Sequence, residues 1–269
     1  MKKITFATVL LAATTLASPA FAQSQFADFI EGIEARSEAS TLSEHVFRGQ
    51  SRGAQSLVSD SEFTLPFGLS GGFLYNAGID PDSDVQRDEI RVYANYSVPL
   101  SDSVSVDIGG THYYYPQFGG LFETRGGSAG SYEAYGSVGL DEVFLSPKGT
   151  VYYDFTLDNL TLEGSIGHDF DLPREGWSAN LGLTAGYVDA DSSFVGEAEV
   201  FNYGYGTATA GLKKIITQEI TFYVNGNFTV NSEDDTLNFD RAVTPAGSAF
   251  ATRDSSSKLW VGTGIALNF

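Results

Sequence analysis

The C-terminal stretch Ser257-Lys258-Leu259-Trp260-Val261-Gly262-Thr263-Gly264-Ile265-Ala266-Leu267-Asn268-Phe269 alternates between two kinds of side chain. From position 259 onward the odd positions hold Leu, Val, Thr, Ile, Leu and Phe, and the even positions hold Trp, Gly, Gly, Ala and Asn. A period of two is that of a β-strand, whose successive side chains point to opposite faces of a sheet. The stretch therefore predicts a strand with one apolar face and one small or polar face.

The end of this strand indicates a membrane barrel. The apolar row finishes at the terminal Phe269, with Leu267 before it and Gly264 five residues back. This ending resembles the signal that the barrel-assembly machinery of the bacterial outer membrane recognises during insertion. The alternative is the last strand of a soluble β-sandwich. The barrel is favoured because the same alternation recurs along the chain, as it does in transmembrane barrels.

Composition narrows the function classes. The chain has 269 residues, no cysteine, and a formal net charge of −19 from 15 basic and 34 acidic residues. Without cysteine, disulfides, thiolate metal sites and cysteine nucleophiles are excluded. The acidic excess argues against nucleic acid as a partner, because phosphate binding is driven by Lys and Arg. It suits a surface that holds cations or a lumen that admits them.

The first residues predict a secretory signal peptide over 1–22. Lys2 and Lys3 form its positive start, an apolar run follows, and Ala20-Phe21-Ala22 is a small-x-small cleavage site. We expect 23–32 to be a periplasmic lead-in and 33–269 to be the outer-membrane barrel domain. No later stretch is long and apolar enough for a spanning helix, so strands would have to cross the membrane.

The rest of the sequence predicts an all-β fold, a transmembrane antiparallel β-barrel of about twelve strands with short periplasmic turns and longer outer loops. The expected strands are 33–43, 55–65, 69–77, 88–98, 104–115, 132–140, 148–155, 161–170, 177–188, 200–212, 220–231 and 257–269. Connections after even-numbered strands are mostly short, and the longest ones, 116–130 and 232–256, follow odd-numbered strands. The register of 200–212 stays open, because Tyr203 and Tyr205 compete with Ala208 and Ala210 for the lipid face.

Ionisable residues on the predicted inner face are the candidate pore lining. They are Glu34, Arg36, Glu38, Asp60, Glu62, Glu89, Arg91, Asp107, Glu133 and Glu163. One interpretation is a narrow water-filled pore that favours cations. The other is a salt-bridged plug that rigidifies the barrel. The pore is favoured, because acids in excess of their basic partners need water or counter-ions.

A short motif after the first strand carries a family resemblance. The segment Glu44-His45-Val46-Phe47-Arg48-Gly49-Gln50-Ser51 resembles the Tyr-x-Phe-Arg-Gly-x-Ser signature of the TorF family of porin-like outer-membrane barrels. Phe47, Arg48 and Gly49 are the sharp part of the match, and His45 stands where that family usually has Tyr. The resemblance implies an outer-membrane barrel with a pore and supplies no solute.

Motifs for catalysis and metal binding are weak. The run 126–130 reads Gly-x-Ser-x-Gly but precedes a strand, whereas a nucleophile elbow follows a strand and opens a helix. Asp80, Asp82 and Asp84 resemble a calcium loop that lacks its later Gly and Glu. His45 is the one plausible general base, and no nucleophile is marked beside it. We therefore predict no catalytic residue, no metal site and no cofactor.

These observations predict a porin-like channel in the outer membrane of a Gram-negative bacterium, through which small solutes or ions diffuse passively. Its partners would be outer-membrane lipid, the barrel-assembly machinery and the solutes themselves. Two alternatives stay open: a non-conducting structural or adhesive barrel whose loops contact partners, and a lipid-modifying or proteolytic barrel enzyme.

Overall fold

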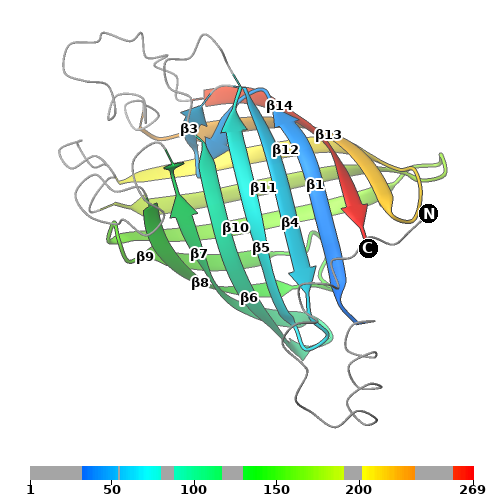
Figure 1. Cartoon of the computed structure of the whole chain (residues 1–269), viewed down its shortest axis with the longest axis horizontal. Coiled ribbons are helices and arrows are strands. Elements are labelled where there is room, and N and C mark those ends of the chain that lie inside the picture. Colours follow the sequence, from blue (N-terminus) through cyan, green and yellow to red (C-terminus); the bar gives the residue numbers. More distant parts are fainter. Residues whose placement is uncertain (1–31, 54, 80–87, 117–129, 191–201, 234–256) are drawn as a thin grey trace, which may run out of the picture. The chain divides into compact units, whose positions relative to one another are not determined.

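The protein folds as a closed antiparallel barrel (Figure 1). A computed structural model describes residues 32–53, 55–79, 88–116, 130–190, 202–233 and 257–269. Within these ranges twelve strands close the barrel in the order β1-β14-β13-β12-β11-β10-β9-β8-β7-β6-β5-β4, and β2 and β3 form a separate hairpin. The strands are β1 (Glu34–Leu42), β2 (His45–Phe47), β3 (Gln50–Gly53), β4 (Ser56–Thr64), β5 (Leu69–Gly78), β6 (Glu89–Ser101), β7 (Val104–Tyr114), β8 (Gly130–Leu140), β9 (Lys148–Asp154), β10 (Asn159–Asp171), β11 (Trp177–Asp189), β12 (Tyr203–Ile215), β13 (Ile220–Asn231) and β14 (Ser257–Asn268).

The C-terminal strand closes the barrel against the first one. β14 pairs with β1 from Arg36↔Asn268 to Leu42↔Gly262, and with β13 on its other side. Beyond the end of β14, the Phe269 backbone N–H donates to the Ala35 carbonyl at 2.8 Å. Closure leaves no open sheet edge, which a strand inside a lipid bilayer could not tolerate, since its backbone would have no water to bind.

Apolar and polar side chains are distributed in the reverse of the usual soluble pattern. Ile108 is 62% exposed, Leu183 54% and Leu259 76%, whereas Glu89 and Asn76 are each only 1% exposed. A soluble protein buries its large apolar residues and exposes its charges. The outer surface therefore matches a hydrocarbon environment and the interior is polar, as in an outer-membrane barrel.

Aromatic residues gather on the outer face near both ends of the strands. At the outer-loop end the His112 and Tyr132 rings stack with centroids 4.3 Å apart. At the short-turn end His168 lies 5.0 Å from Phe144 and 4.7 Å from Phe170, centroid to centroid. These clusters correspond to the aromatic girdles of membrane barrels, so both histidines lie at the lipid interface.

The predicted barrel is confirmed, and two local expectations need revision. The sequence predicts no strand between 43 and 55, but this segment contains the β2–β3 hairpin. The strand expected at 200–212 is observed from Tyr203 to Ile215, and its register is resolved. Tyr203 and Tyr205 are buried in the lumen, while Ala208 and Leu212 are exposed on the lipid face.

The described residues include no helix that could cross a membrane. The expected signal peptide lies outside the described residues.

Candidate functional site

The β2–β3 hairpin turns at the Phe47-Arg48-Gly49 motif. Phe47 pairs with Gln50, so Arg48 and Gly49 are the two central residues of the turn. Their φ angles are 47° and 77°, and positive φ at both positions is the mark of a type I′ hairpin turn. Two separate features require glycine at position 49. One is its positive φ, and the other is the close approach of Tyr205, whose Cβ would lie 2.4 Å from a Cβ on residue 49.

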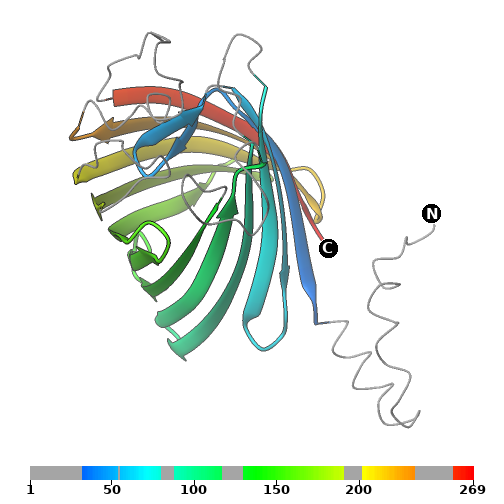
Figure 2. The same cartoon turned by 60° about the vertical axis from the view of Figure 1, so that its left-hand side comes forward.

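The tip of this hairpin reaches across the lumen. Arg48 donates to both carboxylate oxygens of Glu133 on β8, at 2.6 and 2.9 Å, and the Gly49 carbonyl accepts from Asn231 on β13 at 3.3 Å. Five steps around the closed barrel separate β8 from β1, the strand that the hairpin follows. The hairpin therefore spans the barrel interior from one wall to the opposite one (Figure 2).

A second set of ion pairs holds the arms of the hairpin. Arg52 donates to Glu89 on β6 and to the Tyr115 hydroxyl, both at 2.9 Å, and the same hydroxyl donates to Glu89 at 3.0 Å. Arg91, next but one to Glu89 on β6, pairs with it as well. The Glu89 side chain is only 2% exposed, so its charge is compensated at close range by two guanidinium groups.

Phe47 lies among three guanidinium groups. The Cζ atoms of Arg48, Arg52 and Arg91 lie 4.8, 4.0 and 4.6 Å from the centre of its ring. The electron-rich face of an aromatic ring attracts such cations, most strongly where water is excluded. Phe47 therefore joins the arginines of the hairpin to the arginine of the wall, and the motif Phe-Arg-Gly is a packing and turn unit.

His45 at the base of the hairpin is neutral at neutral pH. Its Nδ1 lies 2.6 Å from the Asn76 amide nitrogen on β5, which can donate to the unprotonated ring. Burial lowers the His45 pKa to about 4, Glu89 opposes that shift, and Arg91 and Arg52 reinforce it. No nucleophile contacts His45 in the described part of the chain, so its contacts are those of a structural residue.

Below the hairpin, the wall formed by β1 and β4 is acidic. Glu34, Glu38, Asp60 and Glu62 share the inner face with a single cation, Arg36, which pairs with Glu38. The Tyr93 hydroxyl lies 3.3 Å from Asp60 and 3.1 Å from Glu62. A pocket of about 470 Å³ at the short-turn end is lined by residues of this wall, Glu34, Arg36 and Glu62 among them. Four carboxylates and one guanidinium leave this wall with excess negative charge.

The other two carboxylates of the expected lining are held by local partners. Asp107 on β7 accepts from Lys148 at 2.7 Å and from Ser137 at 2.8 Å. Glu163 on β10 accepts from the hydroxyls of Tyr152 and Tyr205. The structure thus divides the ten expected lining residues into three groups: the hairpin anchor, the acidic wall, and two carboxylates with partners of their own on the strands.

The wall formed by β11, β12 and β13 is polar but uncharged over much of its length, which sequence reasoning did not single out. Thr209 donates to Asn227 at 2.8 Å, and the hydroxyls of Thr207 and Thr229 are 3.0 Å apart. The sequence signal for this wall is the alternation of Thr and Asn along β12 and β13, at positions 207, 209, 225, 227, 229 and 231. The excess negative charge of the lumen therefore lies on the β1–β4 wall, and the β11–β13 wall is largely uncharged.

Inward tyrosines lie flat against the wall, over glycines of neighbouring strands. A Cβ on Gly72 would lie 2.3 Å from the Tyr93 ring, and one on Gly109 would lie 2.4 Å from the Tyr135 ring. Gly264 of the expected assembly signal has the same relation to Tyr223, at 2.7 Å. Because each ring covers a residue without a side chain, it projects little into the lumen, and Gly264 has a packing role of its own.

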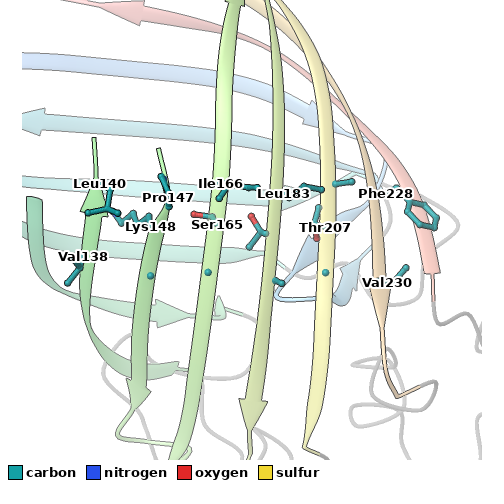
Figure 3. Close-up of a pocket in the computed structure, with 16 residues that line it drawn as sticks. Val138, Leu140, Pro147, Lys148, Ser165, Ile166, Leu183, Thr207, Phe228 and Val230 are labelled. Atoms are coloured by element: carbon teal, nitrogen blue, oxygen red, sulfur yellow. The ribbon is translucent and has the colours of Figure 1, made fainter. Parts of the chain in front are cut away.

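The outer surface has a shallow apolar groove of about 840 Å³ across β8 to β13 (Figure 3). Leu183, Ala208 and Phe228 line it on the lipid face, over positions such as Gly149 and Gly164 where nothing fills the space of a Cβ. This groove belongs to the lipid-facing surface and not to the lumen.

The sequence motifs for catalysis and metal binding lie outside the described residues: Asp80, Asp82, Asp84 and residues 126–129. Within the described residues no cluster of three potential metal ligands occurs.

Comparison with solved structures supports the fold. The KdgM porin in complex with disordered oligogalacturonate is 11% identical, with a TM-score of 0.51 over 88% of this chain and 99% of the porin. A second structure of the KdgM porin gives the same values, and the NanC porin is 13% identical with a TM-score of 0.48 over 87% of this chain and 98% of that one. No family description and no curated protein matches the sequence. The chain thus has the fold of a closed twelve-stranded β-barrel, as the KdgM porin does.

Proposed function

We propose that the protein is a porin-like channel that passes small solutes, prefers cations, and is constricted on its outer side by the β2–β3 hairpin. The observation that carries this proposal is the acidic wall of β1 and β4, where Glu38, Asp60 and Glu62 stand against the single Arg36. Fixed carboxylates in a narrow lumen raise the local cation concentration, and a twelve-stranded barrel keeps them close to any permeating ion.

The solute should differ in charge from the one named for the KdgM porin, whose structure holds oligogalacturonate, an acidic oligosaccharide. Asp60 and Glu62 would repel such a polyanion. Small cations and uncharged polar molecules fit a lumen with one acidic wall and one wall of Thr and Asn.

Membership of the TorF family is also part of the proposal. It is supported by the structural requirement for Phe47, Arg48 and Gly49, each of which has a definable role in the hairpin. We further propose cleavage after Ala22, a barrel domain over 33–269, and recognition of Gly264, Leu267 and Phe269 by the barrel-assembly machinery. We assign no catalytic residue, because His45 contacts Asn76 and no nucleophile in the described residues.

The second candidate is a non-conducting structural barrel. The bidentate anchor of Arg48 on Glu133, on the opposite wall, is the observation in its favour. Conductance of the purified, refolded protein in a planar bilayer separates the two functions. We expect small single-channel currents and a reversal potential of the cation-selective sign across a salt gradient. Heat-modifiable migration on a gel would show that the refolded barrel is intact. If such protein carries no current, the channel is contradicted and the structural barrel is favoured.

A further inference from the structure

Two basic side chains of the described residues form no ion pair with a carboxylate of those residues. The described residues hold nine Lys and Arg, and seven of them form ion pairs with Asp or Glu. The other two, 9 − 7 = 2, are Arg174 and Lys214. In a chain with a net charge of −19, cations without a carboxylate partner are unusual enough to need a physical explanation.

Both of these cations lie against one indole ring. The Arg174 Cζ is 5.3 Å and the Lys214 Nζ is 5.7 Å from the Trp177 ring centroid. Trp177 and Lys214 are direct cross-strand neighbours on β11 and β12, and Arg174 belongs to the turn before β11. The Lys214 ammonium donates to the Glu175 carbonyl at 2.8 Å, which fixes it over this turn.

The cluster of Arg174, Trp177 and Lys214 is placed where the membrane surface should be. Trp177 shares its face with Leu181 and Leu183, which are both more than half exposed to lipid. It lies at the strand end that carries the short turns, which is the periplasmic end of such barrels. Indole, Lys and Arg side chains favour this headgroup region, because their apolar parts face hydrocarbon and their polar ends face water.

The adjoining lysine shows that this arrangement is specific. Lys213 points to the lumen side of β12 and pairs with Asp169 at 2.6 Å, while Lys214 points to the lipid side. The acids near the cluster are Asp171, Glu175 and Glu219, and none of their carboxylates forms an ion pair within the described residues. The Trp177 N–H is buried, so it does not face the headgroup region, and it has no acceptor in the described residues. Two cations therefore face the headgroup region without an anion from the described part of the protein.

We propose that Arg174, Trp177 and Lys214 form a binding site for the phosphate of an anionic phospholipid in the periplasmic leaflet. Arg offers a planar pair of donors that matches phosphate oxygens, and Lys adds a compact charge. The indole ring gives the acyl-glycerol region an apolar surface and orients the two cations above it. A single headgroup would thereby neutralise the positive charge that the protein leaves uncompensated.

Fluorescence quenching by brominated lipids tests this site. The chain has two tryptophans, so the Trp260→Phe variant leaves Trp177 as the only indole. This protein is refolded into bilayers with a small fraction of brominated phosphatidylglycerol or, separately, brominated phosphatidylcholine. We expect phosphatidylglycerol to quench Trp177 at a several-fold lower fraction than phosphatidylcholine, and the double variant Arg174→Gln with Lys214→Gln to abolish the difference.

Lys213→Gln is the matched control, because it removes one positive charge from the neighbouring residue on the opposite face. It should keep the preference for phosphatidylglycerol. Equal quenching of the starting protein by the two lipids would overturn the proposal, and so would an equal loss of preference in Lys213→Gln. The lipid comparison needs no variant at the site, so it stays decisive if the double variant fails to fold. Inhibition by inorganic phosphate alone, without any lipid preference, would identify a general anion site and also contradict the proposal.

Discussion

Arg48 and Glu133 form a bidentate ion pair across the barrel lumen, with N···O distances of 2.6 and 2.9 Å. Arg48 sits at the tip of a two-residue turn and Glu133 on the opposite wall, so one contact fixes how far the hairpin reaches. The side chains are 14% and 3% exposed, and breaking a pair buried to this degree leaves an uncompensated charge. The pair therefore fixes the position of the hairpin tip against the opposite wall.

We expect Glu133→Gln and Arg48→Ala each to release the hairpin tip and raise single-channel conductance. Removing one partner of a buried ion pair costs about 3–5 kcal/mol, because the other charge is left buried without compensation. The double variant should resemble the single ones, because the two residues act as one unit. Lys213→Gln, which breaks an exposed pair with Asp169, should leave the conductance unchanged. Conductance of both Arg48 and Glu133 variants at the wild-type level would show that the tip does not limit the current.

Gly49→Ala tests the turn itself. Its φ of 77° is unfavourable for a residue with a side chain, and the added Cβ would lie 2.4 Å from the Cβ of Tyr205. We expect a loss of about 1–3 kcal/mol in hairpin docking, seen as faster cleavage of the hairpin by protease in folded barrels. Gly164→Ala on the lipid face is the control, since a Cβ there meets nothing within 4 Å. Equal protease resistance of both variants would contradict the tight turn.

The barrel was predictable from sequence because its determinants are local and periodic. Alternation along Leu259 to Phe269 reports a pleated strand with two different environments, and that pattern survives without knowledge of contacts. The hairpin was not predictable in the same way. Its arms are short, and their stability comes from Glu89, Glu133 and Asn231, which lie far from them in sequence.

The lumen residues illustrate the same limit. Alternation puts Glu89, Glu133 and Asp60 on one face of the sheet, but it cannot say which carboxylates find a cation. Glu89 and Glu133 are paired by arginines of a hairpin that no periodicity reveals. Asp60 instead contacts a tyrosine hydroxyl on the acidic wall. Glu89 and Glu133 are therefore structural anchors, whereas Asp60 belongs to the candidate selectivity filter. This difference depends on which side chains meet in the folded barrel.

Hairpin docking should weaken in acid through His45. The docked ring has a pKa of about 4 against an ordinary 6.5, so the released hairpin binds a proton more readily than the docked one. Docking is therefore fully stable above about pH 6.5 and loses stability as the pH falls toward 4, because the released His45 binds a proton that the docked His45 excludes. We expect single-channel conductance to increase as the pH is lowered from about 7.5 to about 4.5, because the hairpin is released.

The carboxylates of the lumen also titrate in this range, so His45→Gln isolates the histidine effect. A glutamine can keep a hydrogen bond to Asn76 and cannot become charged. The variant should lose most of the acid-induced increase, whereas His168→Gln, at the lipid interface beside Phe144 and Phe170, should retain it. An unchanged pH profile in His45→Gln would assign the response to the carboxylates.

Deleting Phe269 tests both the assembly signal and barrel closure. The residue ends the lipid-facing row, and its backbone exchanges hydrogen bonds with Ala35 at 2.8 and 3.2 Å. We expect the truncated chain to accumulate unassembled in the periplasm, measured as loss of heat-modifiable protein from outer-membrane fractions. Phe269→Tyr keeps the aromatic ring and the backbone, and should assemble nearly normally. Normal yield of the deletion variant would mean that neither contact matters for insertion.

The acidic wall should set ion selectivity. Asp60 and Glu62 accept from one tyrosine hydroxyl and have no cation of their own in the described residues, since Arg36 pairs with Glu38. Replacing both by Asn and Gln keeps the size and hydrogen-bonding capacity of the side chains while removing two negative charges. We expect cation-over-anion permeability, taken from the reversal potential across a salt gradient, to fall several-fold.

Removing the cation by Arg36→Gln should shift the reversal potential the opposite way, because it increases the negative charge of the same wall. Both shifts should shrink as salt rises, since the screening length falls from about 10 Å at 0.1 M to about 3 Å at 1 M. Identical reversal potentials in wild type and both variants would refute the acidic filter even if the protein conducts.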